Sequence, residues 1–170
     1  TRSYSSAASD VYKRQVLGPV LESDFGTSVE LVKRFLNGGF PLAPNISFGI
    51  VDVRDVAQLH LLALESPQAS GNRFIASSET LAIPLISEFL RKKIPEYQKR
   101  LPKGTAPDFL IKLLGFFSPL MKTVANQLGK TKELDNSKAK NILGWQPRSG
   151  EEAVIASAKS LIEFDIVKSP

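Results

Sequence analysis

The apolar residues of one early segment recur with the spacing of a single helix face, and polar residues fill the positions between them. The stripe consists of Val29, Leu31, Val32, Phe35 and Leu36. Two hydroxyl residues precede it, and the side chain of either Thr27 or Ser28 can cap the first turn. The sequence Asn37-Gly38-Gly39 then supplies the residues that commonly end a helix. The pattern therefore predicts a helix that is capped by Thr27 or Ser28 and ends at Asn37.

A short apolar strand followed by a second helix is predicted around Asp52. The run from Ile46 to Val53 has the length of a buried strand. Asp52 and Asp55 come next, where acids suit the helix dipole and Asp52 can accept the first N–H groups. Arg54 is expected to face solvent or to pair with a nearby acid. The predicted inward face of this helix consists of Val53, Val56, Ala57, His60 and Leu64, with His60 packed and hydrogen-bonded.

The rest of the chain continues this alternation. Residues 16–20 form a strand end that Gly18 and Pro19 stop, and residues 73–77 form another strand. A helix covers residues 83–94, and a capping box of Ser149 and Glu152 begins the final helix. Trp145 is expected to anchor that last helix. Strands that alternate with helices predict an α/β fold with parallel pairing.

An apolar helical stripe with a break at Ser118-Pro119 lies between residues 107 and 128. It consists of Phe109, Leu113, Phe116, Phe117, Leu120, Met121 and Val124. Three interpretations are open, namely a substrate lid, a subunit contact and a core helix. Leaving this stripe in water would cost about 25 cal/mol per Å² of apolar area, and the opposite face carries few Lys or Arg for a membrane surface. We therefore favour core or lid, and expect no membrane contact.

Composition narrows the function classes. The chain has 170 residues, of which 42% are hydrophobic and 23% charged, as expected for one globular domain. It has no Cys and one His, which excludes disulfides and cysteine nucleophiles and argues against a metal site or a Ser-His-Asp triad. The absence of Cys also fits a reducing compartment such as the cytoplasm.

The net charge of +5 does not indicate a nucleic-acid partner. Arg2, Lys13 and Arg14 against Asp10 contribute +2 in the first fifteen residues, which leaves +3 for residues 16–170. The remaining Lys and Arg are interspersed with Asp and Glu, without a basic stripe that alternates with aromatic residues. We therefore expect no nucleic-acid binding.

The opening segment, TRSYSSAASDVYKRQ, has neither helical nor strand periodicity. It also lacks the continuous apolar region of a signal peptide. The part from Ser5 to Gln15 resembles the translation of a transposon-type sequencing-library adapter. We therefore interpret residues 1–15 as a non-native or disordered tail and expect the natural protein to begin upstream of Val16. The alternative is a genuine flexible N-terminal arm.

Four motifs carry a family resemblance by their order and spacing. They are VLGP at 16–19, FGIVDVRDVAQLHLLALE at 48–65, GNRFIAS at 71–77 and LGWQP at 143–147. From Val16 to about Phe164 the chain resembles the C-terminal half of the extended short-chain dehydrogenase/reductase family, especially its dihydroflavonol, cinnamoyl-CoA and methylglyoxal reductase branch. The resemblance implies that residues 16–170 form the last strands of a Rossmann-like parallel sheet together with a small, mainly helical substrate-binding lobe.

The resemblance also implies an NADP- or NAD-dependent reduction of an aldehyde or ketone, but not by this chain alone. The family's glycine-rich loop, its catalytic Ser or Thr and its Tyr-x-x-x-Lys pair lie upstream of the VLGP strand. Tyr12 is adjacent to Lys13, and Tyr97 has Leu101 at the fourth place after it. We therefore expect no catalytic residue in this chain, no turnover, and weak or no NADPH binding.

Seven positions are the candidate site residues that the resemblance implies. The cofactor-binding candidates are Gly18, Pro19, Thr27 and Ser28, for which turn and cap roles are the alternative. The substrate-binding candidates are Phe25, Phe48 and Ile50, for which core packing is equally open. The expected partner is a small carbonyl substrate, with a homodimer of the whole enzyme as a further option. Metal ligands are not expected.

Two other functions compete with the reductase. A nucleotide-sugar epimerase or dehydratase of the same family would need groups for a diphosphate, and Arg34, Arg73 and Arg91 are only scattered candidates. The second alternative is a non-catalytic binding module. Upstream coding sequence with a glycine-rich loop and a Tyr-x-x-x-Lys pair would eliminate that module.

Overall fold

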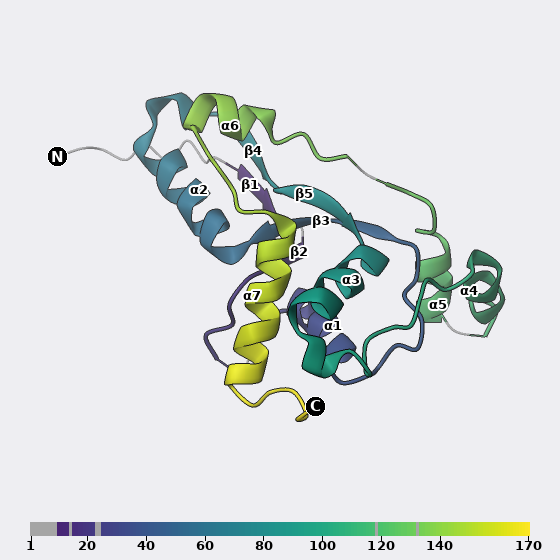
Figure 1. The fold of residues 1–170 in the computed structure, drawn as a ribbon. Coiled ribbons are helices and arrows are strands. Elements are labelled where there is room, and N and C mark those ends of the chain that lie inside the picture. The colour runs from purple at the N-terminus through teal and green to yellow at the C-terminus, as the bar shows by residue number, and fades with distance from the viewer. Residues whose placement is uncertain (1–9, 14, 23–24, 118, 132) are drawn as a thin grey trace.

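The structure is a computed structural model that describes residues 10–13, 15–22, 25–117, 119–131 and 133–170. Within these ranges the chain forms an α/β fold with five short strands and seven α-helices (Figure 1). The strands are β1 (Asp10–Lys13), β2 (Gln15–Leu17), β3 (Ser47–Asp52), β4 (Arg73–Ala76) and β5 (Glu79–Ala82). The helices are α1 (Thr27–Leu36), α2 (Val53–Glu65), α3 (Ile83–Lys93), α4 (Asp108–Leu114), α5 (Pro119–Ala125), α6 (Ser137–Leu143) and α7 (Gly150–Glu163).

The strand pairing is mixed, so the prediction of parallel pairing is only partly correct. Strand β1 pairs in parallel with β4, and β2 pairs in parallel with β3. Strand β5, which the pattern did not predict, runs antiparallel to β3. In the link between β4 and β5, Ser78 donates its N–H to the carbonyl of Ile50 at 2.7 Å, and the Asn136 side chain donates to the carbonyl of Ser77 at 2.7 Å.

The backbone before Val16 is more regular than its residue pattern predicted. Asp10–Lys13 forms β1, whose register pairs Asp10 with Arg73, and Gln15 begins β2. A parallel ladder needs only backbone N–H and C=O groups, so a segment without apolar alternation can still join it. Residues 1–9 and 14 lie outside the described residues. The origin of residues 1–15 stays a prediction.

The larger core cluster lies between β2, β3 and the helices α1, α3 and α7. Helix α1 buries Val29, Val32, Phe35 and Leu36, as its stripe predicted. Helix α7 packs against α1, α3 and β3, and its first turn has the predicted capping box of Ser149 and Glu152. The final helix therefore holds the sheet and the two other helices together (Figure 1).

The smaller core cluster joins α2, β4 and α6 around the fully buried Trp145. Trp145 therefore anchors the segment before α7 to this cluster, whereas α7 itself belongs to the larger one. The predicted inward face of α2 is wrong at Val53, Ala57 and Leu64, which are exposed. The buried positions are Asp55, Val56, Leu59 and Ala63. Among these positions, Asp55 is satisfied by the backbone N–H and the guanidinium of Arg148.

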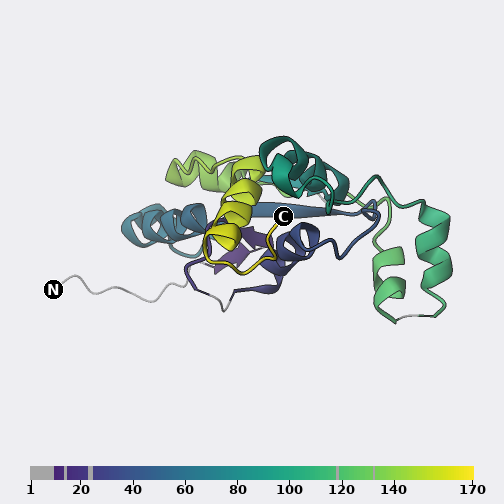
Figure 2. The same ribbon diagram turned by 60° about the horizontal axis from the view of Figure 1, so that its bottom comes forward.

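Helices α4 and α5 form a hairpin at one end of the molecule (Figure 2). The predicted break falls between them, although Ser118 lies outside the described residues, as do the side chains of Leu120 and Met121. The core interpretation of the stripe is wrong for its exposed members. These are Phe109 at 72%, Leu113 at 53%, Phe116 at 85% and Phe117 at 83% exposure.

Candidate functional site

A cavity of about 500 Å³ lies between α1, the strands β2 and β3, and the α4–α5 hairpin. Most of its lining is apolar, and this lining includes Leu17, Leu31, Phe40, Phe48, Ile50 and Leu110. Its polar lining residues are Gln15, Thr27, Ser28 and Arg34. An apolar hollow of this size with a few polar groups has the character of a small-molecule site.

The polar groups of the cavity gather where β2 passes the start of α1. Ser28 donates its hydroxyl hydrogen to Oε1 of Gln15 at 2.7 Å. The prediction of a Thr27 or Ser28 cap is wrong, because the N-cap is Gly26 and it makes no side-chain cap bond. Thr27 and Ser28 are instead the first two residues of the helix, and both line the cavity.

The one cation in the described lining, Arg34, is already paired. Its Nε lies 3.1 Å from Oε1 of Glu30 one turn earlier in α1, and Lys33 lies 3.7 Å from the same carboxylate. The Arg34 side chain is also more than half exposed, at 56%. The cavity therefore presents no concentrated positive charge to a ligand.

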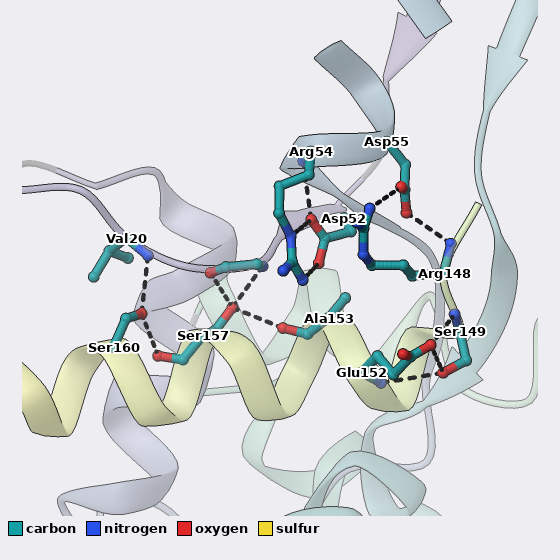
Figure 3. Close-up of polar contacts among 11 residues, drawn as sticks. Val20, Asp52, Arg54, Asp55, Arg148, Ser149, Glu152, Ala153, Ser157 and Ser160 are labelled. Atoms are coloured by element: carbon teal, nitrogen blue, oxygen red, sulfur yellow. Dashed lines mark hydrogen bonds and ion pairs between the residues drawn. The ribbon is translucent and has the colours of Figure 1, made fainter. Parts of the chain in front are cut away.

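The Gly18-Pro19 turn leaves β2 beside this cavity and is held by α7. Gly18 has φ +115°, a conformation that favours glycine. Its N–H donates to Oγ of Ser157 at 2.8 Å, and Val20 donates its N–H to Oγ of Ser160 at 2.9 Å (Figure 3). Two hydroxyls on one face of α7 thus satisfy the backbone on both sides of Pro19.

Asp52 supports the same turn from the end of β3. A Cβ on Gly18 would lie 2.9 Å from Oδ1 of Asp52, so only glycine fits there. Asp52 is the predicted cap of α2, accepting from the Arg54 N–H at 2.9 Å, and the Arg54 guanidinium donates to both carboxylate oxygens at 2.8 and 2.7 Å. Burial raises the pKa of Asp52, but the hydrogen bonds and charge of Arg54 outweigh this and leave the pKa below its ordinary value.

A second ion pair, which the sequence pattern missed, joins α2 to the turn before α7. Asp55 is 1% exposed, and it accepts from the Arg148 backbone N–H at 2.7 Å and from the Arg148 guanidinium. The indole of Trp145 donates to the Asp55 carbonyl at 2.9 Å. No local signal pairs residues 93 positions apart, but the adjacent capping motif at Ser149 marked this turn as structured.

The structure brings together four of the seven predicted site residues. The cavity lining includes Thr27, Ser28, Phe48 and Ile50 and does not include Gly18, Pro19 or Phe25. Their roles toward a ligand stay predictions. Phe25 is half-buried against the larger core, with the Lys33 ammonium 5.2 Å from its ring centroid. Gly18 is buried in the turn that α7 holds.

Three observations concern the groups that a cofactor or a substrate would need. Both backbone polar groups of Gly18 lie 2.8 Å from the Ser157 hydroxyl, so they do not face a phosphate. The sequence contains no Gly-x-Gly-x-x-Gly motif to cradle one. Tyr97 is 2% exposed and lies inside the larger core.

The described residues contain neither a candidate metal site nor a candidate membrane span. No group of three or more His, Cys, Asp or Glu side chains in these residues could hold a metal ion. None of their helices is long and apolar enough to cross a membrane.

Comparison with known proteins relates the chain to reductases. No family model matches it. It is 27% identical over 156 residues to an NADPH-dependent methylglyoxal reductase of Saccharomyces cerevisiae, covering 91% of this chain and 41% of that protein. It is 34% identical over 134 residues to a ketoreductase of Aspergillus niger, covering 78% of this chain and 34% of that protein. The chain thus spans less than half the length of these relatives.

Solved structures agree with the sequence relatives. The yeast methylglyoxal/isovaleraldehyde reductase in complex with NADPH superposes with a TM-score of 0.68 at 25% identity, covering 91% of this chain and 43% of that one. A nucleoside-diphosphate-sugar epimerase of Pseudomonas aeruginosa has a TM-score of 0.66 at 17% identity, covering 93% of this chain and 49% of that one. At that identity the second likeness concerns the fold alone.

Proposed function

The chain belongs to the extended short-chain dehydrogenase/reductase family, and on that premise we propose that it is the substrate-binding lobe of an NADPH-dependent aldehyde or ketone reductase. The relatives that support this include a methylglyoxal reductase and a ketoreductase, each covered over less than half its length. The observation that carries the proposal is the apolar cavity beside the Gly18-Pro19 turn. The same proposal includes a cytoplasmic location.

The residue roles in this proposal depend on where each residue lies around the cavity. Thr27 and Ser28 contact the cofactor side, and the backbone of Gly18 and Pro19 shapes that side without lining the cavity. Phe48 and Ile50 contact the substrate, because both line the cavity from β3. Phe25 shapes the substrate site only indirectly in this proposal, since it packs on the core rather than on the cavity.

A nucleotide-sugar epimerase is disfavoured by the charges around the cavity. A diphosphate needs several convergent donors, whereas Arg34 is paired with Glu30. Arg73 lies on β4 and Arg91 donates to the carbonyl of Pro102, and neither is among the lining residues.

A non-catalytic binding module would bind a ligand but contribute nothing to turnover. An activity assay therefore distinguishes such a module from the reductase.

The test joins the chain to a dinucleotide-binding half taken from a relative. Residues 16–170 are fused behind the dinucleotide-binding half of the yeast methylglyoxal reductase, and NADPH absorbance is followed with an aldehyde added. We expect consumption of NADPH by the chimera and none by the isolated chain. A matched chimera with the catalytic tyrosine of the yeast half changed to phenylalanine is the control.

Two results would contradict the proposal. A folded chimera, with a cooperative thermal transition and NADPH bound, that reduces no aldehyde or ketone would exclude the reductase role. Micromolar NADPH binding by the isolated chain in a calorimetric titration would contradict its role as a substrate lobe only.

A further inference from the structure

A second cavity, which we call the α3 cavity, lies between helix α3 and the segments 43–45 and 102–105. Its volume is about 510 Å³, and it shares no described lining residue with the cavity of the candidate site. We propose that the α3 cavity binds the carboxylate of a small organic acid. The Ser87 hydroxyl and the Arg91 guanidinium are the groups that hold this carboxylate.

The Ser87 hydroxyl is a buried donor without an acceptor. Ser87 is 4% exposed and belongs to the lining of the α3 cavity. Among the residues that the structure describes, its Oγ is the one buried side-chain oxygen or nitrogen that makes no hydrogen bond. A buried polar group without a partner is destabilising, and such groups are rare in native proteins. A ligand oxygen in the cavity would supply the missing acceptor.

The Arg91 guanidinium offers further donors beside this hydroxyl. Arg91 lies four residues after Ser87, so the two share one face of α3, and both line the cavity. The guanidinium donates to the carbonyl of Pro102, which ties it to the opposite wall of the cavity. Because a guanidinium has five N–H donors, this bond leaves others for a ligand. A carboxylate can accept two parallel hydrogen bonds from such a group.

The rest of the lining suits the body of a small organic molecule. Its apolar members include Ala43, Ala82, Pro84, Leu85 and Pro102. Asn45 and Thr105 add an amide and a hydroxyl, and both of these residues are exposed, which places them at the rim. A lining with apolar walls and a few donors therefore fits an acid with a short hydrocarbon chain.

The charges around the α3 cavity favour a single negative charge on the ligand. Arg91 is the one cation and Glu88 the one acid in the described lining. The Nζ of Lys92 lies 2.7 Å from Oε1 of Glu88, so this carboxylate is already paired and a ligand cation would have to compete for it. A phosphate dianion needs several convergent donors and would add a second negative charge beside Glu88. A monocarboxylate avoids both problems.

The experiment titrates the whole isotope-labelled chain and follows its backbone amide chemical shifts. The probe is 4-methylpentanoate, and the matched neutral probe is 4-methylpentanamide, which has the same hydrocarbon chain. We expect saturable shifts centred on Ser87, Arg91 and Thr105 with the acid. The acid should bind at least about tenfold more tightly than the amide or inorganic phosphate.

Two variants test the assigned groups. Ser87→Ala should weaken binding of the acid about tenfold, because a hydrogen bond to a charged group is lost. Its urea midpoint should equal that of wild type, since the hydroxyl makes no bond in the free protein. Arg91→Gln should weaken binding at least about tenfold. The matched control Lys93→Gln removes the same charge from the same turn of α3 and should change binding less than about twofold, because salt screens an exposed charge.

Four results would overturn the inference. They are the absence of saturable shifts with 4-methylpentanoate, equal affinity for the amide or phosphate, unchanged binding by Ser87→Ala, and equal effects of Arg91→Gln and Lys93→Gln. Shifts centred on Phe48 would place the acid in the cavity of the candidate site and would overturn it as well. The titration needs neither cofactor nor turnover, so its outcome is independent of the reductase proposal.

Discussion

The hydroxyl oxygen of Ser157 lies 2.8 Å from both the backbone nitrogen and the carbonyl oxygen of Gly18, a residue 139 positions earlier in the chain. The same oxygen lies 3.1 Å from the carbonyl of Ala153 in its own helix. A hydroxyl accepts the Gly18 N–H and donates its single hydrogen to one of the two carbonyls. The last helix thus holds the turn that borders the candidate site (Figure 3).

Removing this hydroxyl should destabilise the fold. Ser157→Ala leaves the buried Gly18 N–H without its partner, which costs about 1–3 kcal/mol. Urea unfolding monitored by circular dichroism measures the change in the free energy of unfolding. The control Lys159→Ala alters an exposed residue of the same helix and should stay within about 0.5 kcal/mol of wild type. Equal effects of the two substitutions would contradict the role of Ser157.

Local signals explain which parts of the fold could be predicted. The capping box of Ser149 and Glu152 and the Asp52 cap depend on residues two or three positions apart, and both were predicted. The Thr27 or Ser28 cap failed because the Ser28 hydroxyl bonds Gln15 on a neighbouring strand instead of its own helix. Propensity identifies residues able to cap, but tertiary partners decide whether they do.

The inward face of α2 and the hairpin required information from distant segments. Periodicity placed Val53 inside and did not place Asp55 there, yet a carboxylate can be buried when an arginine and a backbone N–H satisfy it. Those partners come from Arg148, 93 positions later. In the candidate site, the resemblance pointed to Phe48 and Ile50, but no pattern indicated that Leu110 would complete the same cavity from α4.

Breaking the Asp55 ion pair should cost more than breaking a surface pair. Arg148→Gln leaves the Asp55 carboxylate, which is 1% exposed, with only the backbone N–H at 2.7 Å. Because the Arg148 side chain is 42% exposed, water can replace part of the lost interaction, so we expect a loss of about 1.5–3 kcal/mol. Arg34→Gln, which breaks the exposed pair with Glu30, should change stability by less than about 1 kcal/mol in the same urea experiment. Similar losses for both variants would show that the buried pair contributes no more to the free energy of unfolding than the exposed pair does.

Stability should depend on pH through Asp52. Its pKa in the folded protein is below the ordinary value of 3.8, so the unfolded chain takes up the proton first as the pH falls. The stability from the ionised carboxylate is therefore present above about pH 4 and is lost as the pH falls through the folded pKa. Asp52→Asn keeps a residue able to cap α2, and its urea midpoint should approach that of wild type at low pH. The neutral control Gln98→Ala should run parallel to wild type at every pH, and a constant gap for Asp52→Asn would contradict the assignment.

The outer face of the hairpin should make the isolated chain self-associate. Phe116 and Phe117 are 85% and 83% exposed, and adjacent apolar side chains in water favour contact with another molecule. Phe116→Ser with Phe117→Ser should reduce association in sedimentation velocity over a range of concentrations, with the melting temperature unchanged because no buried contact is lost. Leu61→Ser, on the exposed face of α2 at 60% exposure, tests a separate patch. If the hairpin variant associates as strongly as wild type, the unpaired strand edges cause the association instead, since free backbone groups also recruit a second chain.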